Sequence, residues 1–79
     1  KTKNNNVKFL NSTKTLVLDF KRVEKSKIII YDLTGKIVYY YRFDNQKQIE
    51  IELLLIPKGF YIVDCLLQNG RINHKFIIE

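Results

Sequence analysis

The feature that most limits what this chain can fold into is a series of short β-prone runs, each followed by residues that favour turns. Large apolar residues alternate with polar ones in TLVLDF and QIEIEL, and Ile, Val, Tyr and Phe fill the periodic positions elsewhere. Successive side chains of a strand point to opposite faces, so alternation indicates strands with one buried face. Turn signals at intervals of about eight to twelve residues are typical of β-sandwiches and barrels. The sequence therefore predicts an all-β protein of roughly six or seven strands joined mostly by hairpins.

The length and charge of the chain limit the number of domains and the kind of partner. Its 79 residues are material for one small domain. The net charge of +6, from 14 Lys and Arg against 8 Asp and Glu, favours an anionic partner, although the basic residues are scattered along the sequence. No apolar run approaches the ~20 residues of a membrane-spanning helix, and the opening KTKNNN lacks the apolar core of a secretory signal peptide. We expect one soluble domain.

Three segments carry residues that specify turns. Asp32 fits position i of a type I turn and Gly35 fits position i+3. Pro57 fits position i+1 of a second turn, which Gly59 closes. Asn69-Gly70 is a strong signal for a two-residue hairpin of type I′. The charged KRVEKS and the polar DNQK, Asp44 to Lys47, are interpreted as two further connections.

Alternation also predicts which residues form the core. The strand FYIVDCLL should bury one face and place Asp64 on the other. In KIVYYYRF either alternating set could be inside, and the tyrosines beside Arg42 could imitate the stacking platform of a nucleic-acid-binding sheet. The residues expected inside on the clearer strands are Leu16, Leu18, Phe20, Ile28, Ile30, Ile49, Ile51, Leu53, Tyr61, Val63, Cys65 and Leu67.

Residues that could carry catalysis or bind metal are few. Cys65 is the single cysteine, so it forms no internal disulfide or zinc cluster, and it leaves the cellular compartment open. His74 has no Cys or carboxylate at metal-ligand spacing and is expected at the surface. Glu50 and Glu52 share one strand face, where solvated neighbours are a better interpretation than a general acid and base. We expect no catalytic residue, metal site or cofactor, and a protein that is not an enzyme.

Three motifs in order carry a family resemblance. They are IYDLTGKIV (Ile30 to Val38), IPKGFYIV (Ile56 to Val63) and NGRINHKFII (Asn69 to Ile78). Together they resemble the C-terminal sorting domain of type IX secretion system cargo in Bacteroidota, over roughly Val7 to Glu79. The chain departs from the family at two places, because Leu10-Asn11-Ser12 replaces Pro-Asn-Pro and the chain ends in Glu79 where a basic residue is common.

The resemblance implies a fold and a role. The fold is an immunoglobulin-like antiparallel β-sandwich of about seven short strands in residues 7–79, after a linker remnant in residues 1–6. The role is a noncatalytic, folded secretion signal for an upstream cargo domain, recognised by the outer-membrane translocon and its shuttle proteins. In the family a cell-surface sortase then usually removes the domain, which leaves both a cleaved and a retained domain open for this chain. The resemblance implies that the cargo is secreted or held at the cell surface of a Gram-negative bacterium. No nucleic acid is expected, and an exposed edge strand would allow two copies to dimerise.

Docking would fall to the turns and the cations around them, because a signal that is read as a folded surface needs rigid turns. The candidate recognition residues are Asp32, Gly35, Lys36, Pro57, Lys58, Gly59, Tyr61, Gly70, Arg71 and Lys75. The alternative function is an adhesive or carbohydrate-binding β-sandwich module of a larger surface protein, and a weaker third is a basic domain that binds nucleic acid.

Overall fold

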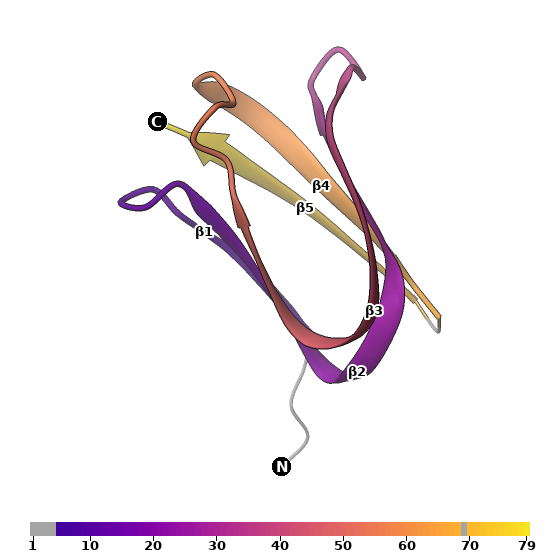
Figure 1. The fold of residues 1–79 in the computed structure, drawn as a ribbon. Coiled ribbons are helices and arrows are strands. Elements are labelled where there is room, and N and C mark those ends of the chain that lie inside the picture. The colour runs from indigo at the N-terminus through magenta and orange to yellow at the C-terminus, as the bar shows by residue number, and fades with distance from the viewer. Residues whose placement is uncertain (1–4, 69) are drawn as a thin grey trace.

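The computed structural model describes residues 5–68 and 70–79, apart from the side chain of Val23, and these residues form five antiparallel strands (Figure 1). The described residues include no helix long and apolar enough to cross a membrane. The strands are β1 (Asn6–Leu10), β2 (Thr15–Asp32), β3 (Ile37–Glu52), β4 (Gly59–Leu67) and β5 (Gly70–Ile78). Residues 1–4 of the expected linker lie outside the described part, and Asn6 begins β1.

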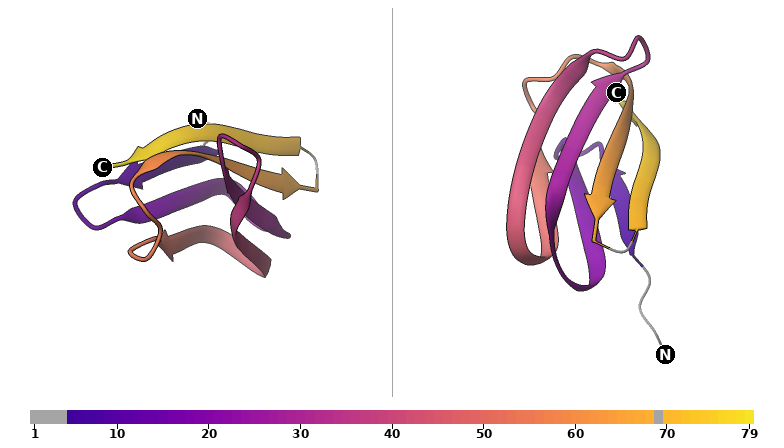
Figure 2. Two further views of the ribbon diagram at one scale, coloured as in Figure 1. Left: turned by 90° about the horizontal axis from the view of Figure 1, so that it is seen from above. Right: turned by 90° about the vertical axis from the view of Figure 1, so that its right-hand side faces the viewer.

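The five strands make one sheet that curls on itself. The strand β3 follows one edge of the 18-residue β2. On the other edge, β1 pairs with the first part of β2 and β4 with its last part. The strand β5 then pairs with β4, and the sheet bends so far that β5 also approaches β1 (Figure 2). The all-β antiparallel prediction is confirmed, but a single, nearly closed, barrel-like sheet replaces the separate sheets of an immunoglobulin-like sandwich.

The strand count is lower than expected because two predicted connections are wrong. KRVEKS lies inside β2, and Asp44 to Lys47 lies inside β3. The two strands stay paired through both segments, with register shifts between Asp19/Glu24 and Glu24/Ser26 and a left-handed Asn45 at φ 49°. Such irregularities bend a strand pair without ending it. Most of these polar residues are exposed along the bend, whereas Glu24 is buried. Their loop-like composition predicts two short strands in place of each long one.

The core fills the space inside the curled sheet. The expected inward faces are confirmed, since Leu16, Leu18, Val63 and Cys65 are fully buried and Leu67 packs against the same cluster. Burying a side chain of this size contributes about 1.5–3 kcal/mol. Pairing with β2 decides which face of KIVYYYRF points inward. Tyr39 lies opposite the buried Ile30 and Tyr41 opposite the buried Ile28. Further along the same face, Phe43 stacks on Phe20 at 5.6 Å between ring centroids.

Two residues depart from simple alternation. Ile37 is two residues before Tyr39 and should share its inward face. The register shift between Ile30 and Tyr31 instead leaves Ile37 60% exposed. His74 was expected at the surface but is half-buried, because it lies opposite Val63 on the inner face of β5, between Ile72 and Phe76.

Candidate functional site

One end of the curled sheet gathers segments that are far apart in the sequence. This loop end comprises residues 11–14, 32–37, 53–59 and 77–79, between β1 and β2, between β2 and β3, between β3 and β4, and at the chain end (Figure 1). Backbone pairing holds the segments together, because Asp32 lies opposite Tyr61 and Gly59 opposite Ile78. The amide of Leu53 also donates to the carbonyl of Lys14 at 2.8 Å.

The Asp32–Gly35 turn is built as predicted. The amide of Gly35 donates to the carbonyl of Asp32 at 3.0 Å, and Gly35 has φ 92°, a left-handed value that suits glycine. The Asp32 carboxylate accepts from the Thr34 hydroxyl at 2.6 Å and from the amides of Thr34 and Lys36 at 2.9 and 3.1 Å. The Thr34 hydroxyl and the Lys36 amide hold the pKa of Asp32 below its usual value. The turn is rigid, and it exposes Leu33, Lys36 and Ile37.

The segment from Pro57 to Tyr61 forms a second fixed corner. The Tyr61 hydroxyl donates to the carbonyl of Pro57 at 2.6 Å, while its ring is buried beside Phe76. Gly59 has φ 151°, and a β-carbon there would lie 3.7 Å from the Tyr61 ring. The hydrogen-bonded turn itself comes earlier than predicted, because the amide of Ile56 donates to the carbonyl of Leu53 at 3.1 Å. The motif of Pro, Gly and Tyr therefore anchors the loop rather than turning it.

Large apolar side chains are exposed around this end. Leu54 is 64% exposed and Leu55 96% exposed at the tip of the loop between β3 and β4. Most of the exposed large hydrophobic side chains in the described residues lie at or beside the loop end: Leu10, Leu33, Ile37, Leu54, Leu55, Phe60 and Ile77. Tyr40 and Tyr41 are also exposed but lie away from it. Sequence reasoning missed Leu54 and Leu55, because a run of three leucines after a strand gives no local sign of which are outside.

Asn11 was also missed as a functional position. Its side chain accepts from the amide of Glu79 at 2.9 Å and donates to the carbonyl of Ile77 at 3.1 Å. Lys14, held in a left-handed conformation, donates from Nζ to the carbonyl oxygen of Glu79. The one sequence signal for a role of Asn11 was that it keeps the asparagine of the family's Pro-Asn-Pro segment, although both prolines are replaced. These contacts join the turn after β1 to the end of β5.

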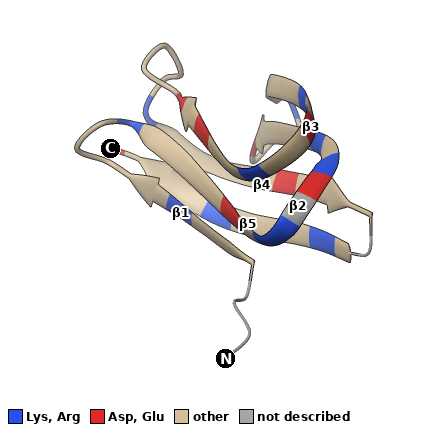
Figure 3. Cartoon of the chain, turned by 60° about the horizontal axis from the view of Figure 1, so that its bottom comes forward, with Lys and Arg blue, Asp and Glu red and all other residues tan. Residues whose placement is uncertain are grey.

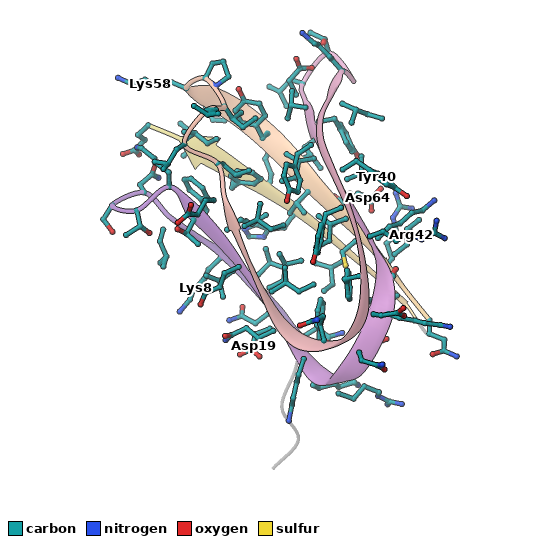
Figure 4. All side chains as sticks on the ribbon, in the orientation of Figure 1. Lys8, Asp19, Tyr40, Arg42, Lys58 and Asp64 are labelled. Atoms are coloured by element: carbon teal, nitrogen blue, oxygen red, sulfur yellow. The ribbon has the colours of Figure 1, made fainter. Side chains whose placement is uncertain are left out.

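The predicted recognition residues divide between the two ends of the molecule. Lys75 borders the loop end, with its Nζ 5.8 Å from the centroid of the Phe60 ring. Gly70 and Arg71 lie at the opposite end, and Asn69 of the predicted type I′ turn is outside the described residues. Those that share the loop end are Asp32, Gly35, Lys36, Pro57, Lys58, Gly59 and Tyr61 (Lys58 is labelled in Figure 4).

Arg71 is engaged inside the domain. Its Nε and Nη2 donate to the two carboxylate oxygens of Asp64, each at 2.8 Å. Asp64 does lie on the outer face, as predicted, but its side chain is only 12% exposed. The hydrogen bonds from Arg71 hold the pKa of Asp64 below its usual value. Arg71 therefore neutralises a covered carboxylate, which removes it from the free cations.

The arrangement suits recognition better than chemistry. Burial, together with the charges of Asp64 and Glu24, raises the pKa of Cys65 to about 12, so the thiol stays protonated at neutral pH. The described residues hold no group of three His, Cys, Asp or Glu side chains that could bind a metal ion. What the loop end offers is a set of exposed apolar and cationic side chains on anchored loops.

The sequence matches one family model, described as the secretion system C-terminal sorting domain, over residues 11–79. No curated protein matches the chain. The matched region begins at Asn11 and includes every segment of the loop end, whereas β1 precedes it.

Proposed function

Because the chain belongs to the family of type IX secretion system C-terminal sorting domains, which serve as noncatalytic secretion signals for their cargo, we propose that the secretion machinery recognises it through the loop end. Membership of this family implies recognition by the type IX machinery, and secretion across the outer membrane or a location at the cell surface. The proposal adds the surface and the residues through which that recognition occurs.

The observation that carries the proposal is the exposure of Leu54 and Leu55 on an anchored loop. Leu55 is 96% exposed beside the exposed Leu54, so the tip of the loop presents adjoining apolar side chains of the kind that mark an interaction site. The loop between β3 and β4 is held by the bond from Tyr61 to Pro57, so little freedom remains to be lost when it binds. A cluster of exposed apolar side chains marks an interaction site, and a loop that is already ordered loses less entropy when it binds.

Cations accompany the apolar side chains. Lys36 and Lys58 are exposed on the two loops, and Lys75 lies above Phe60 near the start of β4. Charges at the rim of an interface mainly speed association and orient the partner. The receptor surface that fits is therefore an apolar cleft with acidic residues at its rim, on a translocon or shuttle protein. The sortase and the cargo act upstream of β1, where the residues before Asn6 serve as the linker.

The test joins residues 1–79 to the C-terminus of a periplasmic reporter in a host with a type IX system. Leu54→Ser with Leu55→Ser should lower surface reporter at least about tenfold, the effect of losing roughly 1.4 kcal/mol of binding. Tyr40→Ser is the matched control, since Tyr40 is 52% exposed away from the loop end. The control should export normally. Normal export of the double variant, or an equal loss of export in the control, would refute the loop end as the recognised surface.

A further inference from the structure

A hollow lies where β2 and β3 bend, away from the loop end. It has a volume of about 710 Å³ and opens to solvent. Figure 3 shows Lys and Arg positions along the bent part of β2. The hollow is lined by Lys25, Ser26 and Lys27 of β2, Arg42, Phe43 and Asp44 of β3, and Leu66 of β4. It shares no residue with the proposed recognition surface.

Two of the lining cations face each other across a strand pair. Lys27 lies directly opposite Arg42 in the register of β2 and β3. Side chains at such positions have β-carbons roughly 4.5–5.5 Å apart, so like charges there repel. Neither residue forms an ion pair or hydrogen bond with any described residue.

The surrounding acids do not relieve this repulsion. Lys27 also lies opposite Leu66, and Leu66 opposite Arg71, so three cations and one leucine cross the outer face in one row. The Asp64 carboxylate on that face is already bound by Arg71. Figure 4 labels Asp64 and Arg42. Asp44 is the one described carboxylate that lines the hollow, against Lys25, Lys27 and Arg42. The hollow therefore keeps an excess of positive charge.

We propose that this hollow binds a phosphate group. Arg42 supplies the planar fork of donors that matches a phosphate, and Lys27 supplies a point charge beside it. Lys25, two residues before Lys27 on β2, adds a third cation to the lining. An anion between Lys27 and Arg42 replaces their repulsion by two attractions. The volume exceeds that of a lone phosphate, and Leu66, half-buried on the outer face, gives the rest of the ligand an apolar contact.

The test measures binding by the 79-residue chain with two probes, pyrophosphate and phosphatidylcholine vesicles with or without phosphatidic acid. Lys27→Gln with Arg42→Gln should lower the affinity for pyrophosphate at least tenfold. Lys8→Gln with Lys58→Gln removes the same charge elsewhere and should change it less than twofold. Amide shifts on titration should be largest at residues 25–27, 42–44 and 66.

The two probes separate the sources of the phosphate. Saturable pyrophosphate binding that depends on Lys27 and Arg42 assigns the site to free or soluble phosphates. The same dependence seen only with phosphatidic acid vesicles assigns it to a lipid headgroup. Equal losses in the two double variants would mean that net charge alone attracts anions, and the site would be refuted. Equally tight binding of a polyglutamate peptide would also overturn the choice of phosphate. A failure of export in the Leu54 and Leu55 test has no bearing on these results.

Discussion

Asn11 and Glu79 are 68 positions apart in the sequence, yet the side-chain oxygen of Asn11 accepts a hydrogen bond from the backbone amide of Glu79 at 2.9 Å. The same side chain donates to the carbonyl of Ile77 at 3.1 Å. It therefore links the first turn of the domain to its last strand, where the curled sheet comes closest to closing. Together with Lys14, which donates to the carbonyl of Glu79, this side chain joins the turn after β1 to the end of β5.

Replacing Asn11 by alanine should weaken this closure. The two hydrogen bonds to β5 and a longer one from Lys14 Nζ are lost. Each has a net value of about 0.5–1.5 kcal/mol, and water replaces part of it at these exposed groups, so the free energy of unfolding should fall by roughly 1–3 kcal/mol. Urea denaturation measures it. Ser12→Ala, at the exposed neighbour, is the control and should change little. Equal stability of the Asn11→Ala variant and the unmodified protein would contradict the role assigned to this residue.

Tyr61→Phe keeps the buried ring and deletes the hydroxyl that bonds Pro57. Stability should drop by about 0.5–1.5 kcal/mol, because the carbonyl of Pro57 loses its partner. The loop between β3 and β4 should also exchange its amide hydrogens faster, which mass spectrometry can follow. Unchanged exchange at residues 53–58 would show that the hydroxyl does not anchor the loop.

Gly35→Val tests the left-handed position of the turn between β2 and β3. A β-carbon at Gly35 would meet no atom within 4 Å, so the cost arises from the backbone at φ 92°. A β-branched residue there should destabilise the domain by roughly 1–3 kcal/mol and reduce export, whereas Gly35→Asn, which tolerates this conformation, should cost less. Thermal unfolding ranks the two. The same loss in both variants would point to something other than backbone conformation.

The pair of Asp64 and Arg71 predicts a pH dependence. Folding lowers the pKa of Asp64, so the unfolded chain takes up protons first as the pH falls. The stability from this group is full above the unfolded pKa of about 4 and is lost as the pH falls through the lower folded value. Arg71→Gln should therefore destabilise the domain at pH 7 and much less at pH 2. A difference that stays constant with pH would exclude the ion pair as its cause.

The opposed cations at the bend can be tested by stability alone. Lys27→Glu places a carboxylate opposite Arg42 and should raise the free energy of unfolding by about 0.5–1 kcal/mol in low salt, an effect that salt should reduce. Lys8→Glu, on β1, makes the same charge change away from the bend. If the free energy of unfolding rises equally in both variants, the increase reflects net charge and not the pair of Lys27 and Arg42.

Much of the fold was predictable because its signals are local. The inward faces of β2 and β4, the turn at Asp32 to Gly35 and the burial of Cys65 follow from alternation and from residues suited to particular turns. The bend was not predictable in this way, because KRVEKS and DNQK have the composition of loops. In the structure they instead lie inside β2 and β3, which stay paired with each other. The exposure of Leu54 and Leu55 depends on where the chain crosses from β3 to β4. The run of leucines gives no local signal for the position of that crossing.

The candidate site shows the same division. The motifs around Asp32 and Pro57 were recognisable, but nothing local indicated that Asp32 would lie opposite Tyr61 or that Arg71 would be bound to Asp64. By itself the sequence determined an all-β chain, its buried faces and its corners, because side-chain period and turn preference act over a few residues. Only the tertiary structure decided that one sheet curls, which corners meet and which cations remain unpaired, because these depend on strand edges that find each other across the whole chain.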